Sequence, residues 1–394
     1  MLALLLVIIY IAYISLGLPD SLLGTAWPAA YMALGVPVSM AGIISAVISC
    51  NTIVSSLLSS RVIRWLGTGL TTTISVSMTA AALFGFSLSP NYWTMVLFAI
   101  PLGLGAGSVD AALNNFVALH YKARHMNWLH SFWGIGASLG PVIMSYYLAR
   151  SGWRSGYSTI GWIQTGLVVV LIASLPLWMR ASNGQKAAET SGKVFSIKEL
   201  LKVKGARQAL TAFFCYCAVE STAGLWGSSF LVLLRGICPE TAASWVSLYY
   251  FGITLGRFIS GFLTMRINNR NLIRIGLVLI VTGILLVMTP SIDFILMCGF
   301  FMIGLGCAPI FPSLIHDTPE NFGSDMSQSM IGLQMACAYV GTTLMPPLFG
   351  LIGQYISMGL LPVYLMIIAI VMIAMVERLN RIKQGQAAAQ TSNE

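Results

Sequence analysis

Apolar runs long enough to cross a lipid bilayer follow one another along the whole chain. A single crossing needs about 20 mostly apolar residues, and cutting the sequence at its polar, glycine and proline punctuation leaves twelve such runs. Only 8% of the 394 residues are charged, whereas soluble domains carry about 25%. The sequence therefore predicts an all-α integral membrane protein with twelve transmembrane helices.

A polar stretch divides the predicted helices into two sets of six. The first set covers 3–30, 38–59, 69–89, 93–119, 126–149 and 157–179. The second covers 207–234, 241–264, 271–289, 293–315, 325–352 and 358–379. We expect an N-terminal six-helix bundle, a cytoplasmic linker with a short surface helix near 196–203, and a C-terminal six-helix bundle with a short tail, at 1–180, 181–205 and 206–394 respectively.

The distribution of lysine and arginine predicts the orientation in the membrane. Most of them, including Arg61 and Lys122, fall on one side of the predicted helices, and the other side holds only Arg150, Arg154 and Arg235. By the positive-inside rule, both termini and the linker face the cytoplasm of a plasma (inner) membrane. The net charge of +9 then reflects loops that face anionic lipid, and we expect no nucleic acid partner.

The two halves of the sequence also match each other. A slowly drifting offset relates Asp20 to Glu220, Gly24 to Gly224, Gly103–Gly105 to Gly304–Gly306, and Gly136 and Pro141 to Gly341 and Pro346. Such an offset predicts a parallel repeat of two pseudo-symmetric six-helix bundles, which is typical of transporter folds.

Short motifs in both halves carry a family resemblance. They read GLPDSL from Gly17, GLGAGSVDAALNNF from Gly103, MNWLHSFWGIGASLGP from Met126, FFCYCAVES from Phe213, GITLGRFISG from Gly252 and FPSLIHDTPENFG from Phe311. Through them the chain resembles the major facilitator superfamily and, within it, the fucose–glucose branch of sugar:cation symporters. The resemblance implies a site between the bundles, a monosaccharide substrate, a coupling cation and no cofactor.

The chain departs from this family pattern at three positions. Ser60 precedes Arg61 in the loop between the second and third helices, where the family usually has an acidic residue. Asp110 stands where the branch commonly has glutamate, and His130 where it often has an amide. The first departure puts in question how this loop latches the two conformations, and leaves the fold unaffected.

Acidic residues inside apolar helices are the candidate cation-coupling residues. A carboxylate in the bilayer core costs several kcal/mol unless it faces water or a partner. Asp110 has Asn114 four residues further on, on the same helix face, and the resemblance places a coupling carboxylate there. Asp20 and its repeat partner Glu220 are further candidates. Asp20 has the alternatives of accepting from a sugar hydroxyl and of a helix-interface hydrogen bond. Glu220 has the alternatives of accepting from the substrate and of a structural partner for Arg257.

Amides, a histidine and tryptophans within the apolar helices are the candidate substrate-binding residues. Amides both donate and accept hydrogen bonds, which suits sugar hydroxyls, and tryptophan offers a flat face to a pyranose. A buried amide has the alternative of joining two helices, and a tryptophan that of anchoring at the membrane interface, which we favour for Trp27. The candidates are Asn114, Asn115, His130, Trp133, Gln164, Trp226 and Gln334.

Further residues have predicted roles in proton transfer, structure and gating. His130 is a candidate proton relay to Asp110. Arg257 is expected to join helix ends on the cytoplasmic side, and Arg61 belongs to the loop between the second and third helices. Pro309 and Pro346 are expected to bend the tenth and eleventh helices, which suits helices that gate a pathway.

Enzyme chemistry has no motif in this sequence. The glycine run at 103–107 lacks a preceding strand, so we discount nucleotide binding, and no metal-ligand spacing appears. The sequence predicts a monomeric secondary transporter that carries a hexose or deoxyhexose together with H⁺. The alternatives are efflux of drugs or other amphiphiles, Na⁺ as the coupling ion, and a non-transporting membrane sensor.

Overall fold

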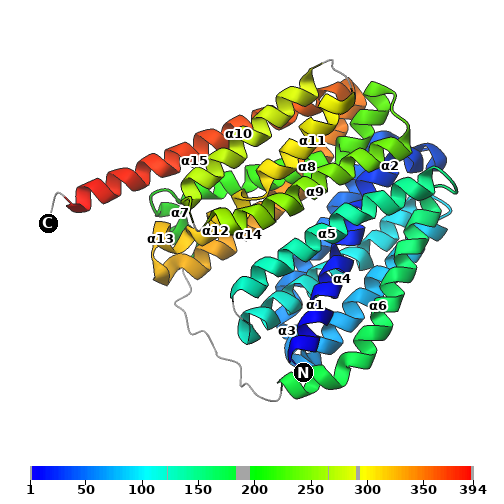
Figure 1. Ribbon diagram of the computed structural model, residues 1–394, viewed down its shortest axis with the longest axis horizontal. Helices are drawn as coiled ribbons and strands as arrows, with labels where there is room; N and C mark the ends of the chain where they lie inside the picture. The colour runs from blue at the N-terminus through cyan, green and yellow to red at the C-terminus, as the bar shows by residue number, and fades with distance from the viewer. Residues whose placement is uncertain (1, 122, 183–195, 265, 290–292, 392–394) are drawn as a thin grey trace.

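The computed structural model of the protein describes residues 2–121, 123–182, 196–264, 266–289 and 293–391 (Figure 1). Within these ranges the regular structure is entirely helical. Helices suit this sequence because a membrane offers no water to backbone groups, so each segment must satisfy its own N–H and C=O groups.

The first half of the chain forms six crossing segments. Its helices are α1 (Leu2–Asp20), α2 (Leu22–Leu34), η1 (Val38–Met40), α3 (Ala41–Leu88), α4 (Tyr92–His120), α5 (Ala123–Leu148) and α6 (Trp153–Ser182). The predicted first span is divided into α1 and α2 at Ser21. The second and third spans are joined in α3, which leaves helical geometry at Gly67 with φ 73° and ψ 164°, a conformation that glycine adopts at little cost.

The second half begins with the short helix predicted near 196–203. This helix is α7 (Ile197–Lys202), and it starts with a capping box in which Ser196 and Glu199 each accept a hydrogen bond from the other's backbone N–H. The helices that follow are α8 (Ala206–Arg235), α9 (Pro239–Leu263), α10 (Asn269–Met288), α11 (Asp293–Cys307), α12 (Ile310–His316), α13 (Thr318–Phe322), α14 (Ser324–Ile352), η2 (Gly353–Ser357), η3 (Met358–Leu360) and α15 (Leu361–Thr391).

The described helices account for the twelve predicted crossings. Ten segments are long and apolar enough to span a membrane, and the longest of them, Ser329–Gly385, holds both α14 and α15 with η2 and η3 between them. The 26 residues of α5 are about 39 Å long at 1.5 Å per residue, also enough for one crossing. The protein is therefore a multi-pass integral membrane protein, as its composition predicts.

The helices gather into two groups that meet at one end (Figure 1). Helices α1 to α6 lie on one side and α8 to α15 on the other, and the groups separate toward the end that carries the N-terminus and α7. Contacts between the groups run through α2 with α8, α5 with α9, and α3 with α14. We call the end where the groups meet the closed seam.

Two glycines related by the internal repeat make the closest contact of the closed seam. Gly24 in α2 lies directly against Gly224 and Leu225 in α8, so close that a Cβ atom on Gly24 would clash with the carbonyl oxygen of Gly224. The residues matched at an offset of 200 in the sequence therefore face each other where the two halves touch.

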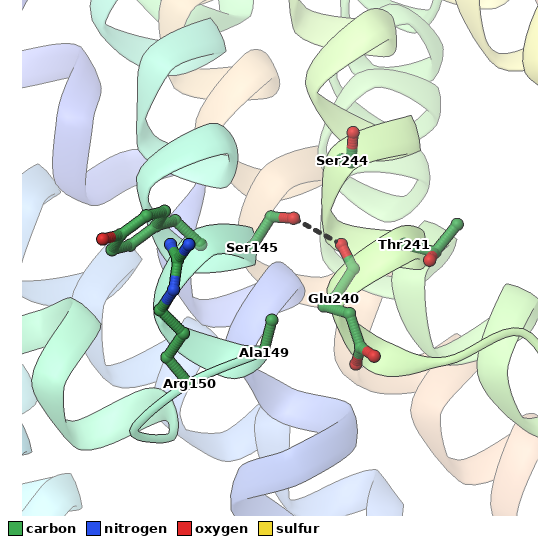
Figure 2. A pocket seen from close by; sticks show the side chains of 7 residues that line it. Ser145, Ala149, Arg150, Glu240, Thr241 and Ser244 are labelled. Atoms are coloured by element: carbon green, nitrogen blue, oxygen red, sulfur yellow. Dashed lines mark hydrogen bonds between the residues drawn. The ribbon is translucent and has the colours of Figure 1, made fainter.

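Helices α5 and α9 close a second part of the seam. The Ser145 hydroxyl donates a hydrogen bond of 2.7 Å to the backbone carbonyl of Glu240 (Figure 2). Deeper in the protein, the Ser138 and Thr254 hydroxyls are 3.3 Å apart. These contacts hold the halves together on the side opposite α7.

Candidate substrate and cation site

A cavity of about 1360 Å³ lies between the two halves and is lined by residues of both. Its inner wall includes Asp20, Asp110, Trp133, Glu220 and Arg257, described below. At its other end the wall is formed by residues at the ends of α10, α12 and α13, the end of the molecule that carries α7 (Figure 1). The cavity thus reaches the surface on the α7 side, and the closed seam blocks it on the other.

Asp110 in α4 lies in this wall and is held by two hydrogen bonds to one oxygen. The Tyr13 hydroxyl donates to its Oδ1 at 2.9 Å, and the Asn114 amide donates to the same atom at 3.0 Å. Asn114 reaches Asp110 because residues four apart lie on one helix face, as the spacing predicts. Both donors are neutral, so they orient the carboxylate without cancelling its charge.

The glycines near Asp110 bring its helix close to α3. A Cβ atom on Gly103 would clash with the carbonyl of Ile48, and one on Gly107 with the carbonyl of Thr52. The close neighbour expected on this glycine face is therefore a helix backbone.

Asp20, the last residue of α1, accepts a hydrogen bond from a tryptophan of α5. The Trp133 Nε1–H donates to Asp20 Oδ2 at 2.7 Å, and both side chains line the cavity. Gly17 places α1 against α5, because a side chain there would meet the backbone carbonyl of Trp133. Close packing of these two helices thus brings the indole to the carboxylate.

Glu220 and Arg257 form an ion pair in the inner wall of the cavity. Their closest N–O distance is 3.4 Å, and the side chains are 20% and 16% exposed. The Arg257 guanidinium also lies 5.0 Å from the centre of the Trp133 ring, within cation–π range. By comparison, Arg274 binds Glu377 through two hydrogen bonds of 2.7 Å, so the Arg257 pair is long.

Arg257 does not lie where we expected it. The sequence suggested a residue that joins helix ends, but its side chain lies in the cavity wall and pairs with Glu220, the alternative partner that we had kept open. A guanidinium is costly inside an apolar helix unless it meets water or a carboxylate, and Glu220 supplies the carboxylate here.

His130 also lines the cavity, near Asp110 but separated from it by an aromatic ring. Its imidazole stands edge-on to the Tyr13 ring with 6.0 Å between ring centres, and Tyr13 in turn donates to Asp110. Any proton transfer between His130 and Asp110 would therefore involve the Tyr13 hydroxyl or water.

Two of the predicted substrate-binding amides join helices instead of facing the cavity. Gln164 is 1% exposed; it accepts from the Ser15 hydroxyl at 2.5 Å and donates to the Ser15 carbonyl at 2.6 Å, which links α6 to α1. Gln334 is also 1% exposed and accepts from the Thr318 hydroxyl at 3.0 Å. These contacts agree with the alternative that each buried amide joins two helices.

Two tryptophans are fully enclosed by protein. Trp226, predicted to bind substrate, is 0% exposed and donates to the Pro346 carbonyl at 2.8 Å, which joins α8 to α14. Trp27, expected at the membrane interface, is equally buried and donates to the Val38 carbonyl at 2.7 Å. Both expectations are wrong about location, because each indole N–H finds a carbonyl inside the protein.

Arg61, Pro309 and Pro346 are not among the residues that line the cavity. Arg61 is exposed on α3, and the side chain of Asn115 lies outside the described residues. Pro309 stands between α11 and α12, so the tenth crossing is interrupted there. Pro346 lies within α14, which continues as a helix through it.

Several residues that line the cavity were not predicted from the sequence. They are hydroxyl-bearing and aromatic side chains, including Tyr13, Ser49, Thr52, Tyr250 and Tyr339. Tyr13 had a usable signal, since it lies seven residues before Asp20 and therefore on the same helix face. The others are single polar groups in apolar helices, with no spacing that separates them from packing residues.

Two helical bundles that face each other across a cavity open at one end define a membrane transporter built for alternating access. The family model described as "Major Facilitator Superfamily" matches residues 9–238 and 231–392. The chain belongs to the Major Facilitator Superfamily, and it is a transporter and not an enzyme.

Two proteins named as transporters are similar to this chain at low sequence identity. The chain is 22% identical to the glucose/mannose transporter GlcP of Bacillus subtilis over 254 residues, which is 61% of each chain. It is 19% identical to the uncharacterized MFS-type transporter YcaD of Escherichia fergusonii over 87% of each chain. The match to GlcP thus spans about three-fifths of that protein's length.

Solved transporter structures superpose on nearly the whole chain. A crystal structure of the nucleoside transporter NupG has a TM-score of 0.77 at 14% identity and covers 95% of this chain and 98% of its own. A structure of the peptide transporter POT has a TM-score of 0.72 at 12% identity and covers 96% and 95% respectively. At these identities the likeness concerns the fold alone.

Proposed function

We propose that this protein is a secondary active transporter that carries a monosaccharide together with H⁺. The observation that carries the proposal is that Asp110, Asp20 and Trp133 line the same cavity. Both carboxylates accept hydrogen bonds from neutral donors. Carboxylate oxygens accept from sugar hydroxyls, and an indole face packs on the apolar face of a pyranose. The similarity to a protein named as a glucose/mannose transporter supports the same substrate class.

The transport cycle follows from the two ends of the cavity. With both termini and the linker on the cytoplasmic side, the present structure faces inward, because the cavity reaches the surface beside α7. When the closed seam opens and the α7 side shuts, Asp20 and Asp110 face the outside. A cation binds there first, and the sugar follows. When the two bundles rock and the seam closes again, the cation and the sugar are exposed to the inner side. The transporting unit is a monomer.

The chemistry of the substrate is tested by counterflow in proteoliposomes. Vesicles loaded with unlabelled D-glucose should take up a trace of radiolabelled D-glucose, and a panel of hexoses and deoxyhexoses should compete with it. Peptides and amphiphilic drugs, tested at the same concentrations, should leave this uptake unchanged. Competition by drugs with none by any sugar would reject the sugar proposal in favour of drug efflux.

The coupling ion is tested separately from the substrate. Uptake of a sugar that competes in the counterflow assay is measured under an imposed H⁺ gradient without Na⁺, and under a Na⁺ gradient at equal pH. We expect only the H⁺ gradient to drive accumulation. Accumulation driven by Na⁺ alone would replace the proton by Na⁺ as the coupling cation.

A further inference from the structure

The inner cavity wall holds more negative charge than positive. Three carboxylates, Asp20, Asp110 and Glu220, line it, together with one guanidinium, that of Arg257. The other charged residues of the cavity, Arg270, Asp317 and Glu320, belong to helix ends on the α7 side. Inside the apolar spans, the described cavity wall therefore carries a surplus of acids.

Glu220 is the carboxylate with a cation of its own. Arg257 lies 3.4 Å from it on the neighbouring helix, so the two opposite charges offset each other. A second cation at Glu220 would leave the Arg257 charge uncompensated inside the membrane, which is unfavourable.

Asp20 and Asp110 have only neutral partners among the described residues. Asp20 accepts from the Trp133 indole, and Asp110 accepts from Tyr13 and Asn114. The Trp133 ring presents its N–H to Asp20 and its face to Arg257, so the indole separates that guanidinium from Asp20. The two acids lie on different helices, α1 and α4, and share no hydrogen-bond donor in the part of the chain that the structure describes.

Closing the cavity removes water from both acids, and each ionised carboxylate then costs several kcal/mol unless a cation accompanies it. We propose that one transport cycle moves two cations with each substrate, one at Asp20 and one at Asp110, while Glu220 carries none. A proton held on His130 beside Tyr13 would serve Asp110 equally and leave the number at two. This inference rests on the proposed cation-coupled sugar transport and adds its stoichiometry.

The stoichiometry is measured as the sugar gradient at which net flux stops. Proteoliposomes with the membrane potential clamped at zero receive a tenfold H⁺ gradient and a series of opposing D-glucose gradients, and the direction of initial net flux is recorded. One cation per sugar balances at a ratio of about 10, and two cations at about 100. We expect the wild-type protein to balance near 100.

Three variants assign the cations to their carboxylates. Asp20→Asn and Asp110→Asn should each lower the balance ratio to about 10, since each removes one cation site. The double variant Glu220→Gln/Arg257→Gln should keep it near 100, although transport is slower. Counterflow of D-glucose identifies the preparations that are folded, because exchange needs no gradient.

The outcomes separate this inference from the function on which it rests. A wild-type ratio near 10 overturns the two-cation proposal and leaves coupled sugar transport standing. A ratio near one under both H⁺ and Na⁺ gradients, with counterflow intact, overturns coupling itself. A ratio of about 10 in the Glu220→Gln/Arg257→Gln variant would move one cation from the aspartates to Glu220.

Discussion

The surroundings of a single side chain decide its role in the central cavity. Trp133 directs its N–H to Asp20 and its ring face to Arg257, both in the cavity wall. Trp226 sits among Phe349, Gly350 and the Pro346 carbonyl with no exposed surface. The first is available to a substrate, and the second fastens α8 to α14.

The two tryptophans should respond differently to the same substitution. Trp133→Phe removes the hydrogen bond to Asp20 and part of the aromatic face, and should weaken competition by D-glucose in counterflow about 10-fold, equivalent to about 1.4 kcal/mol. Trp226→Phe leaves the Pro346 carbonyl without a buried donor. It should lower the free energy of unfolding by about 1–3 kcal/mol with glucose competition unchanged.

Thermal unfolding in detergent and glucose counterflow, measured on both variants, check this contrast. A large loss of glucose affinity in Trp226→Phe at unchanged stability would place that tryptophan in the substrate site. An unaltered affinity in Trp133→Phe would remove Trp133 from it.

Close helix packing at glycine is the feature that shapes the closed seam. Gly24 allows α2 to touch α8 at Gly224, and Gly42 allows α3 to touch Pro347 of α14. Because the contacting atoms at Gly24 are backbone, they have no rotamer with which to move aside. Any side chain at Gly24 must therefore push the two halves apart at this end.

Gly24→Ala should favour the conformation in which the seam is open. A cysteine introduced by Ser45→Cys in the cavity wall reports on access, once the cavity-lining Cys217 and the exposed Cys50 and Cys238 are replaced by serine. A membrane-impermeant maleimide should label it from the α7 side in the parent protein and several-fold more from the opposite side after Gly24→Ala. Gly166→Ala, whose added Cβ meets nothing within 4 Å, is the matched control.

Unchanged sidedness in Gly24→Ala would show that this glycine contact does not control the seam. Labelling that shifts equally in Gly166→Ala would show that the effect belongs to helix stiffness in general, because alanine favours helix over glycine at any site.

The length and composition of the apolar runs predict the helices well, but they predict poorly which way each helix face points. Twelve crossings, the 196–203 helix and the break at Pro309 follow from apolar length, capping residues and proline. The sequence does not predict whether Gln164 faces a cavity or a neighbouring helix, because a helix that is apolar all round has no polar face that indicates its orientation. Asp110 with Asn114 was predictable because its partner lies on its own helix.

The whole molecule is open on one side and closed on the other, and residues matched by its internal repeat meet on the closed side. Gly24 and Gly224 occupy equivalent places in the two halves and meet where the halves touch, while Asp20 and Glu220 line the cavity beneath them. The halves differ in charge, since Glu220 has Arg257 and Asp20 has a neutral indole. This difference supports our proposal that cation coupling belongs to the N-terminal half.

Concentrative uptake by the intact protein tests cation-coupled sugar transport most directly. Proteoliposomes are given an inward H⁺ gradient, and internal radiolabelled D-glucose is followed against the external concentration. The wild-type protein should raise internal glucose well above the external level, and the double variant Asp20→Asn/Asp110→Asn should only equalise the two while retaining counterflow. Equal concentrations in the wild type, or accumulation by the double variant, would contradict coupling at these two carboxylates.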